Sequence, residues 1–258
     1  MLKIGLVGTG HLGKIHLRNL LELPVDFEVV GFYDTDDPTV QEIQREFQTT
    51  SFSDLEDLMN ASEALLIASP TLSHFPIAVQ ALKKGKHIFI EKPVCFTVEE
   101  SKKLLLYAQE AGVVVQVGHV ERFNPALIAA NPFVQNPLFI ESRRTAPFQK
   151  RGTDVSVVYD LMIHDIDIAL NIANSNVKKI SAFGMNVLSD SIDVASAHLS
   201  FENGCTAYLS ASRVSDQRER KSCFFMQDAH VYVDFLNKTV DRHELMQESV
   251  EDRQLVQT

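Results

Sequence analysis

The chain has 258 residues, of which 45% are hydrophobic and 22% charged, as in a globular protein of one or two domains. Its net charge of −10 argues against general nucleic-acid binding, and no apolar run is long enough to span a membrane. Met1 leads directly into an apolar segment, without a secretion signal. The three cysteines, Cys95, Cys205 and Cys223, lack metal or disulfide spacing. We therefore expect a cytoplasmic protein with no metal centre and no membrane or nucleic-acid partner.

The N-terminal segment predicts a dinucleotide-binding unit. The apolar run Leu2–Val7 is typical of a buried strand, and the glycine-rich sequence Gly8–Gly13 follows it directly. A helical pattern comes next and ends before Pro24. A second apolar strand, Phe27–Tyr33, leads to Asp34. Strand, glycine-rich turn, helix, strand and acid in this order are the fingerprint of a Rossmann fold.

Each glycine has a separate part in that fingerprint. Gly8 makes the tight turn, Gly10 lets the backbone approach a pyrophosphate, and Gly13 lets the helix pack close to the strand. The helix N-terminus, with His11 and Leu12, offers free N–H groups to the phosphates. The alternative is a glycine-rich turn in another kind of parallel sheet.

Asp34 predicts the choice of cofactor. A carboxylate at this position accepts hydrogen bonds from the ribose hydroxyls, which favours NAD over NADP. Asp36 and Asp37 stand beside it, and any of the three acids can instead solvate a loop.

The rest of residues 1–118 alternates strands with helices. We expect strands at Ala64–Ser69, His87–Ile90 and Val113–Gly118. Two capping boxes, Ser53 with Glu56 and Thr97 with Glu100, predict helix starts, and Gly85 and Gly112 predict helix ends. This alternation predicts a doubly wound parallel sheet that binds its ligand at the carboxyl ends of the strands.

Residues 119–258 predict a second, α+β domain. We expect a short helix at Pro125–Ala130, a strand at Leu138–Arg144 and a long helix at Asp154–Ala173. Later strands are expected at Ile180–Val187, Val194–Phe201, Cys205–Ser212 and as a pair near Cys223–Phe235. Asn203-Gly204 indicates a hairpin. These patterns favour an open, mainly antiparallel sheet covered on one face.

The long helix carries a polar stripe within an apolar sequence. Asp160, His164, Asp167 and Asn171 share one face, whereas Asp165 lies off it and is interpreted as structural. An Asp one turn before a His can orient the imidazole and raise its basicity, which suits a general base acting on a hydroxyl. The alternative is a satisfied core network or a solvent-facing stripe.

A second candidate group is Glu91-Lys92-Pro93, at the carboxyl end of a predicted strand. Lys92 can polarise a substrate oxygen there, and Pro93 can fix the chain direction through a cis bond. Taken alone, these three residues are more typical of a surface loop than of a catalytic site.

A short basic segment interrupts the acidic sequence. It contains Arg143, Arg144, Lys150 and Arg151, and Arg122 can approach it in space. It suits an anionic ligand, or else it is an ordinary solvated surface.

Taken together, these motifs resemble the glucose–fructose oxidoreductase / inositol dehydrogenase / MocA (Gfo/Idh/MocA) family over nearly the whole chain. The family order is kept by Gly8–Gly13, by Ser69-Pro70-Thr71 with His74, by Glu91-Lys92-Pro93 and by Asp160 to Asp167. The resemblance implies an NAD-dependent dehydrogenase whose catalytic group is Lys92, Asp160 and His164. It also implies the cofactor-binding residues Gly8, Gly10, His11, Leu12, Gly13, Asp34, Ser69, Thr71, His74, Glu91 and Lys92.

Within the family, Gly118–Pro125 and the segments 151–155 and 163–167 are similar to the branch that oxidises UDP-N-acetylglucosamine at the sugar 3-position. This likeness implies a sugar or sugar-nucleotide substrate bound by His119, Arg122, Arg151, Asp160 and His164. His164 would take the hydroxyl proton, Asp160 would stabilise the imidazolium, and Lys92 would hydrogen-bond to the alkoxide, although the resemblance also permits Lys92 as the proton-transfer residue. A neutral polyol or free sugar is the alternative substrate, and a non-catalytic NAD-binding sensor or scaffold is the alternative of another class.

The resemblance carries two further expectations. Family members form oligomers, so it implies a homodimer or homotetramer. They also continue beyond this C-terminus with a strand and a helix, whereas residues 247–258 are polar and predict neither. We therefore expect a second domain that is truncated at its C-terminus, with an exposed sheet edge.

Overall fold

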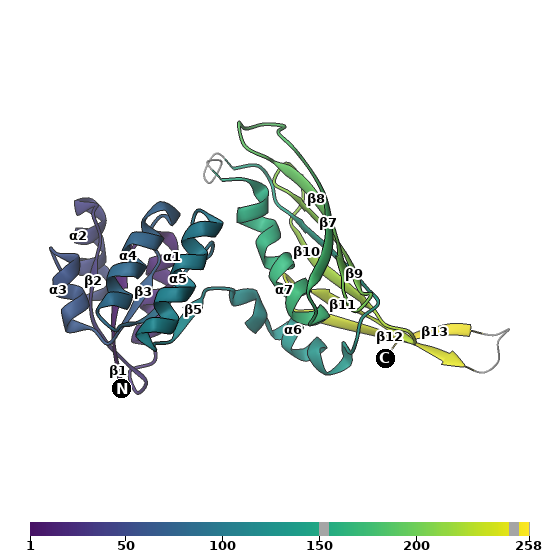
Figure 1. Cartoon of the computed structure of the whole chain (residues 1–258), viewed down its shortest axis with the longest axis horizontal. Helices are drawn as coiled ribbons and strands as arrows, with labels where there is room; N and C mark the ends of the chain where they lie inside the picture. The colour runs from purple at the N-terminus through teal and green to yellow at the C-terminus, as the bar shows by residue number, and fades with distance from the viewer. Residues whose placement is uncertain (150–154, 248–252, 258) are drawn as a thin grey trace. The chain divides into compact units, whose positions relative to one another are not determined.

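The computed structural model describes residues 1–149, 155–247 and 253–257. It divides into two compact units, Met1–Gly118 and His119–Thr258, which are described separately below (Figure 1). Among the described residues, none of the helices combines the length and apolar character needed to cross a membrane.

The first unit is a parallel sheet with helices on both faces (Figure 1). Its five strands, in spatial order, are β2 (Phe27–Tyr33), β1 (Leu2–Val7), β3 (Ala64–Ile67), β4 (His87–Ile90) and β5 (Val115–Val117). Its helices are α1 (His11–Leu21), α2 (Asp37–Phe47), α3 (Leu55–Ala61), α4 (Thr71–Lys83) and α5 (Val98–Ala111). The predicted Rossmann arrangement is therefore confirmed, with strand ends shifted by a few residues at β3 and β5.

Two hydrophobic cores hold this sheet between its helix layers. Ile4 and Leu6 of β1 pack with Leu17 of α1 on one face, while Val7 packs on the other face with Ile77 of α4. Because successive side chains of a strand point to opposite faces, the buried run Ile4–Val7 of β1 is what a strand covered on both sides requires.

The helix boundaries test the capping predictions. Thr97 and Glu100 form the predicted capping box at the start of α5. The prediction for Ser53 is wrong, because the neighbouring Asp54 caps α3 by accepting a hydrogen bond from the Glu56 N–H at 2.6 Å. Gly112 follows α5 in the left-handed conformation that a glycine adopts readily, as predicted.

The second unit is an eight-stranded, mainly antiparallel sheet with the order β13-β12-β11-β10-β6-β9-β8-β7. Its strands are β6 (Phe139–Thr145), β7 (Val177–Met185), β8 (Val194–Phe201), β9 (Thr206–Ser212), β10 (Glu219–Phe225), β11 (Ala229–Asp234), β12 (Thr239–Gln247) and β13 (Arg253–Gln257). Only the β6–β9 pair is parallel among the described strand pairs of this sheet. Before the sheet come a 3-10 turn (Val120–Phe123), α6 (Pro125–Ala130) and a second 3-10 turn (Asn131–Phe133).

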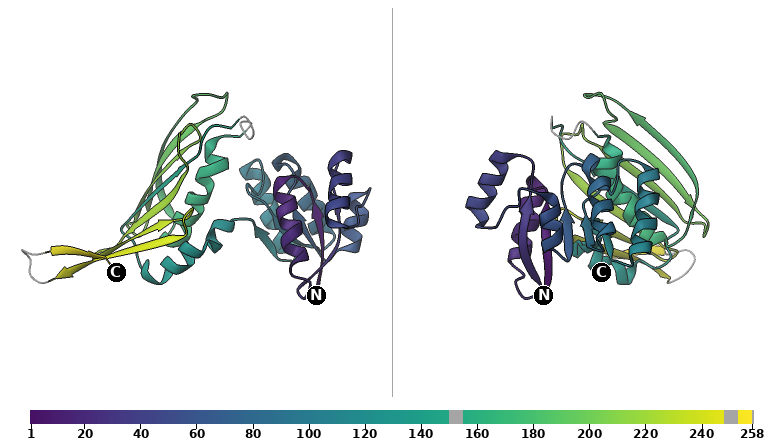
Figure 2. Two further views of the ribbon diagram at one scale, coloured as in Figure 1. Left: turned by 180° about the vertical axis from the view of Figure 1, so that it is seen from behind. Right: turned by 60° about the vertical axis from the view of Figure 1, so that its left-hand side comes forward.

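Register divides this sheet into a helix-covered face and an open face. The covered face carries Leu199, Leu209, Ile140 and Phe224, which are buried in one core with helices α6 and α7 (Ile163–Ala173). Figure 2 shows α7 lying along that side of the sheet. The alternate residues face the other way, so the fold agrees with the predicted α+β domain with an open sheet.

The long predicted helix is interrupted. Residues Val158–Met162 form a π-helical turn, and regular α-helix begins only at Ile163, while the predicted start at Asp154 lies outside the described residues. A π turn holds one more residue than an α turn and is frequent at functional sites. Asp160 lies inside it, and His164 is the second residue of the regular helix that follows.

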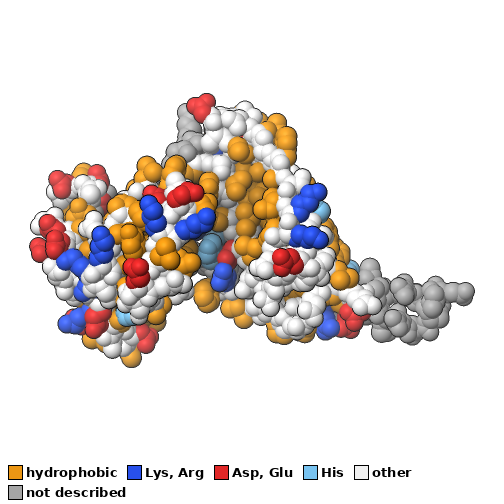
Figure 3. Space-filling view, viewed as in Figure 1, with side chains coloured by type: hydrophobic (Ala, Val, Ile, Leu, Met, Phe, Trp, Pro, Cys, Tyr) orange, Lys and Arg blue, Asp and Glu red, His pale blue; other side chains and the backbone are white. Residues whose placement is uncertain are grey.

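The C-terminal region contains strands that the sequence analysis did not predict. β12 pairs with β11, and β13 pairs with β12, which corrects the expectation that residues 247–258 form no strand. At the opposite edge, residues 178–188 around β7 are all exposed, with Ile180 and Phe183 both 64% accessible. Figure 3 shows hydrophobic side chains at the surface of this unit.

Candidate functional site

The first candidate site lies where the strand order of the first unit reverses. The chain passes from β1 to β2 on one side and later to β3 on the other. The loops after β1 and β3 therefore meet at one edge of the sheet, which is where doubly wound folds bind nucleotides. The contact is close, because a Cβ added to Gly8 would lie 2.6 Å from the backbone N of Ser69.

The three fingerprint glycines differ in their surroundings. Gly8 has φ +87°, a conformation that other residues rarely adopt. A Cβ on Gly13 would lie 2.1 Å from the Gly8 carbonyl oxygen, so helix α1 packs on the loop with no room for a side chain. A Cβ on Gly10 would meet nothing within 4 Å. The loop is thus closed at two glycines and open at the third, where a ligand can reach the backbone.

The helices that begin at these two loops have bare N-termini. α1, after Gly10, and α4, after Pro70, have neither a capping side chain nor an acid in the first turn. In contrast, the N-termini of α2, α3 and α5 are all capped by side chains, from Asp36, Asp54 and Thr97. Free N–H groups and the positive end of the helix dipole favour a phosphate at α1 and α4.

Asp34 is joined to the glycine-rich loop. Its carboxylate accepts hydrogen bonds from the Thr9 N–H at 2.6 Å and the Thr9 hydroxyl at 2.8 Å, and from the Asp36 N–H at 3.0 Å. Asp36 caps α2 and Asp37 is the first residue of that helix. Of the three neighbouring acids, Asp34 is therefore the one that lies beside the dinucleotide loop.

The segment Glu91-Lys92-Pro93 follows β4 and is built on buried contacts. The Glu91 side chain is 8% exposed and lies 2.6 Å from His16 Nε2, and its other oxygen accepts a hydrogen bond from the Lys92 N–H at 3.1 Å. The Lys92–Pro93 peptide bond is cis. The buried His74 has Nε2 2.8 Å from the Ser69 carbonyl and Nδ1 3.0 Å from the Pro93 carbonyl. Both ring nitrogens contact backbone, so His74 connects the loops that carry Ser69 and Lys92.

The polar stripe of the second unit is only partly buried. Asp160 and His164 are half-buried, Asp167 is buried and Asn171 is exposed. Arg122 donates two hydrogen bonds to the Asp167 carboxylate, from Nε at 2.7 Å and from one terminal nitrogen at 2.5 Å. His119 Nδ1 lies 3.8 Å from the same carboxylate. The structure thus brings two predicted substrate-binding residues, His119 and Arg122, to the Asp167 end of the stripe.

A buried ion network fixes α7 on the sheet. Arg144 is 1% exposed and donates to Asp165 at 2.8, 3.1 and 3.2 Å and to Glu121 at 2.8 Å. Burial by itself lowers the pKa of Arg144, but the charges and hydrogen bonds of Asp165 and Glu121 outweigh it and raise that pKa. Asp165 therefore has the structural role expected from its place off the stripe, and Glu121 is a partner that the sequence analysis missed.

Two members of the predicted basic cluster, Arg143 and Arg144, do not share a surface. Arg143 and Arg144 are consecutive in β6 and point to opposite faces, where Arg143 pairs with Glu219 at 2.9 Å and Arg144 is buried. Lys150 and Arg151 lie outside the described residues, so the prediction of Arg151 as a substrate-binding residue stays a prediction.

A second ion network surrounds Asp193, which is fully buried. It accepts hydrogen bonds from the N–H groups of Val187, Leu188 and Ser189 and from Arg213 at 2.7 Å. Burial acts to raise the pKa of Asp193, but the bonds from Ser189, Arg213 and the backbone outweigh it and hold that pKa below its ordinary value. Arg213 also donates to the Val155 carbonyl at 2.7 Å, just before the π turn.

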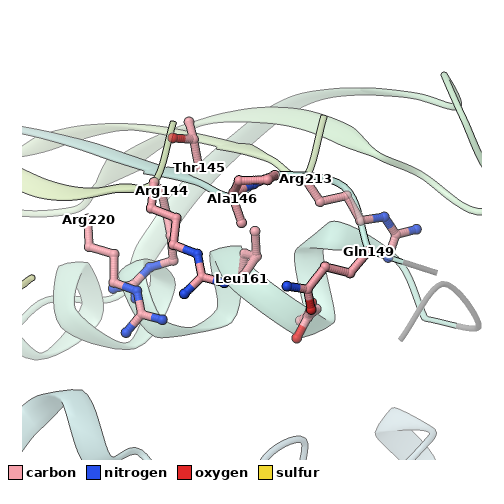
Figure 4. Close-up of a pocket in the computed structure, with 10 residues that line it drawn as sticks. Arg144, Thr145, Ala146, Gln149, Leu161, Arg213 and Arg220 are labelled. Carbon is pink, nitrogen blue, oxygen red and sulfur yellow. The ribbon is translucent and has the colours of Figure 1, made fainter. Parts of the chain in front are cut away.

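These networks border a pocket of about 190 Å³ at the end of the sheet where β6 ends and β10 begins (Figure 4). Its lining residues are Arg144, Thr145, Ala146, Pro147, Gln149, Asp160, Leu161, Arg213, Arg218 and Arg220. The sequence analysis singled out Asp160 and Arg144 but missed Arg213, Arg218 and Arg220. Within the described residues, no group of three or more His, Cys, Asp and Glu side chains is arranged to hold a metal ion.

The first unit is a Rossmann fold whose uncapped helix N-termini can bind a phosphate. The second is an α+β unit with Asp160 and His164 on one helix face. Together they define a two-domain, nucleotide-dependent oxidoreductase. Residues 2–119 match the model of the oxidoreductase family with an NAD-binding Rossmann fold, and residues 132–232 match the Gfo/Idh/MocA C-terminal domain. The chain belongs to the Gfo/Idh/MocA oxidoreductase family, and NAD is its cofactor.

Comparison with individual relatives supports the same family. The chain is 33% identical over 240 residues to the UDP-N-acetylglucosamine 3-dehydrogenase of Acidithiobacillus ferrooxidans, covering 93% of this chain and 76% of the relative. It is 28% identical to the scyllo-inositol 2-dehydrogenase (NAD(+)) of Bacillus subtilis, covering 83% and 68%. A solved structure of the Acidithiobacillus enzyme GnnA superimposes with a TM-score of 0.89 at 32% identity, covering 99% of this chain and 82% of that one.

Proposed function

We propose that the protein is an NAD-dependent dehydrogenase of a sugar nucleotide, and that it oxidises the 3-hydroxyl of UDP-N-acetylglucosamine. The observation that carries this proposal is the likeness to UDP-N-acetylglucosamine 3-dehydrogenase, at 33% identity over 93% of the chain. The basic pocket beside Asp160 supports an anionic substrate over a neutral one.

The first unit has the groups that NAD requires. The pyrophosphate would lie against the open backbone at Gly10 and the bare N-termini of α1 and α4. Asp34 would accept hydrogen bonds from the adenosine ribose, and its negative charge would repel the 2′-phosphate of NADP. NAD, when bound, accepts the hydride from the substrate carbon.

The chain itself supplies the proton chemistry. We assign His164 as the group that takes the proton of the substrate hydroxyl through an imidazole nitrogen, with Asp160 one turn away stabilising the imidazolium. Lys92 would donate a hydrogen bond to the developing alkoxide. His74, which joins the Lys92 loop to the Ser69 loop, would hold that lysine in position.

Two alternatives are tested together with this proposal. A neutral polyol is the substrate class suggested by the inositol dehydrogenase relative. A non-catalytic NAD-binding scaffold would use the first unit alone. Incubation of the protein with NAD and UDP-N-acetylglucosamine, glucose or myo-inositol, followed by NADH absorbance, separates the three.

The residue assignment has a matched control on the same helix. His164→Ala should reduce turnover by about a hundredfold or more, the usual loss for a positioned base, without changing NAD affinity. Asn171→Ala, on the same face but exposed, should keep wild-type turnover. Wild-type turnover in His164→Ala would remove His164 from the mechanism, and no NADH with any nucleotide sugar would reject the proposed substrate.

A further inference from the structure

We propose that the pocket at the β6–β10 end of the second unit is an anion subsite, in which Arg218 and Arg220 bind the diphosphate of a nucleotide sugar. This inference rests on the proposed function for the rest of the substrate, but the anion site itself is defined by the pocket. It names the residues that would select a charged substrate over a neutral sugar.

Four arginines line the pocket, and they differ in what already neutralises them. Arg144 is enclosed between the buried carboxylates of Asp165 and Glu121. Arg213 is tied to the buried Asp193 and to backbone and hydroxyl oxygens. Losing any of these contacts would leave a buried charge without compensation, so these two arginines form the wall of the pocket and do not serve the ligand.

Arg220 and Arg218 are the available cations. Arg220 has a side chain that is 42% exposed, and it forms a 3.3 Å ion pair with Glu121, whose Oε1 is already bound more closely by Arg144. Arg218 is exposed, and the described residues include no ion-pair partner for it. An Arg fork with spare N–H donors is the side chain best suited to phosphate oxygens.

Strand geometry directs Arg220 to the pocket. Arg220 of β10 lies opposite Arg144 of β6, and Figure 4 shows the two side chains next to each other, directed from the sheet toward the helix layer. Arg218 precedes β10 by one residue and also lines the pocket. Their sequence neighbours Glu219 and Lys221 point to the open face, in line with Arg143.

The pocket has room for a charged group. Its volume of about 190 Å³ admits a diphosphate. Asp160 lines the same pocket. A ligand anchored by its diphosphate at Arg218 and Arg220 would therefore extend its hydroxyl-bearing ring toward the Asp160 end of the polar stripe.

The test uses UDP as the probe, titrated by calorimetry into the NAD-loaded full chain at low and moderate salt. Arg218→Gln and Arg220→Gln should each weaken UDP binding by about tenfold or more, as expected for the loss of one charge-assisted contact. Raising the salt concentration should also weaken UDP binding by the wild-type protein, because salt screens the charges. Arg143→Gln removes an equal charge from the adjacent strand on the opposite face, so it should leave UDP binding unchanged.

The outcomes separate this inference from the proposed function. Equal UDP binding by the wild type, Arg218→Gln and Arg220→Gln would overturn the inference, as would an equal loss in Arg143→Gln or no UDP binding by the wild type. Because Arg218 is exposed, its substitution tests the site without disturbing the fold. Arginine-dependent UDP binding without any NADH formation would uphold the subsite and reject the proposed reaction. NADH formation that is unchanged by both arginine substitutions would uphold the proposed reaction and reject the subsite.

Discussion

Substitution of Gly10 and of Gly13 by alanine should separate nucleotide binding from folding within one loop. Gly10 has φ −61°, which any residue adopts, and an added Cβ meets nothing within 4 Å. Gly10→Ala should therefore change the free energy of unfolding by less than about 1 kcal/mol, the scale of a helix-cap substitution. The methyl group would nevertheless occupy space that the pyrophosphate needs, so NAD affinity should fall by about tenfold or more, or about 1.4 kcal/mol.

Gly13→Ala should behave differently. Its Cβ would lie 2.1 Å from the Gly8 carbonyl oxygen, whereas ordinary contact begins at 3.4 Å, so helix and loop must separate by about 1.3 Å, the difference between these distances. Such crowding of a packed site typically costs about 1–3 kcal/mol. Gly13→Ala should thus lose both stability and NAD affinity.

The assay combines calorimetric NAD titration with urea unfolding. Because the chain has two compact units, the transition that added NAD shifts to higher urea reports on the unit that binds it. Gly112→Ala is the control, since it strains a left-handed helix end with φ +63° and should lower stability without changing NAD affinity. Wild-type NAD affinity in Gly10→Ala, or equal destabilisation by Gly10→Ala and Gly13→Ala, would refute the assignment of this loop.

Three further substitutions test individual carboxylates. Asp34→Ala should narrow the preference for NAD over NADP in parallel titrations, and equal binding of both cofactors by the unaltered protein would reject its role. Asp165→Asn should lower the free energy of unfolding by about 3–5 kcal/mol in urea, because it leaves the buried Arg144 with one carboxylate fewer, and a loss below 1 kcal/mol would contradict this. The pKa of Asp193 is held below its ordinary 3.8, so its ionised form stabilises the fold above that pH and this contribution is lost on acidification. The Asp193→Asn variant should therefore be less stable than the wild type at pH 7. The difference between their thermal unfolding midpoints should shrink below pH 3.8. A difference that stays constant with pH would contradict this link between protonation and stability.

Sequence patterns were sufficient for the first unit because its strands are buried on both faces. A short apolar run such as Leu2–Val7, followed by a glycine-rich turn, is typical of a strand buried in a parallel sheet. The one wrong helix start arose because Ser53 and Asp54 are adjacent and both can cap. The sequence contains no signal that decides between two neighbouring capping residues.

The second unit was less predictable for physical reasons. β12 contains Asp241, Arg242 and Glu244, which have low strand propensity, so its conformation depends on pairing with β11 more than on its own residues. The π turn around Asp160 changes the backbone without any proline or glycine to signal it. In contrast, the sequence analysis grouped Arg143 with Arg144 although the predicted strand Leu138–Arg144 already placed them on opposite faces, because consecutive residues of a strand face opposite ways.

The pocket arginines could not be grouped from the sequence. Arg144 is the residue before the end of β6, and Arg213 follows β9. Arg218 precedes β10, and Arg220 is the second residue of that strand. They converge only because β6 lies between β9 and β10 in the sheet, a strand order with one parallel pair that no local pattern specifies. The helix residues Asp160 and His164 were recognisable because polar side chains on an apolar helix stand out in a single segment.

The buried Arg144 also bears on how enzymes of this design acquire new substrates. It joins helix α7 through Asp165 and the start of the unit through Glu121, so any shift of the helix along the sheet would leave buried charges unpaired. Selection can therefore act little on the placement of Asp160 and His164. Arg218 lies at an exposed rim and can be replaced at low cost to folding. In such an architecture the proposed acid–base residues keep their places, while the fold tolerates substitutions around the mouth of the proposed substrate pocket.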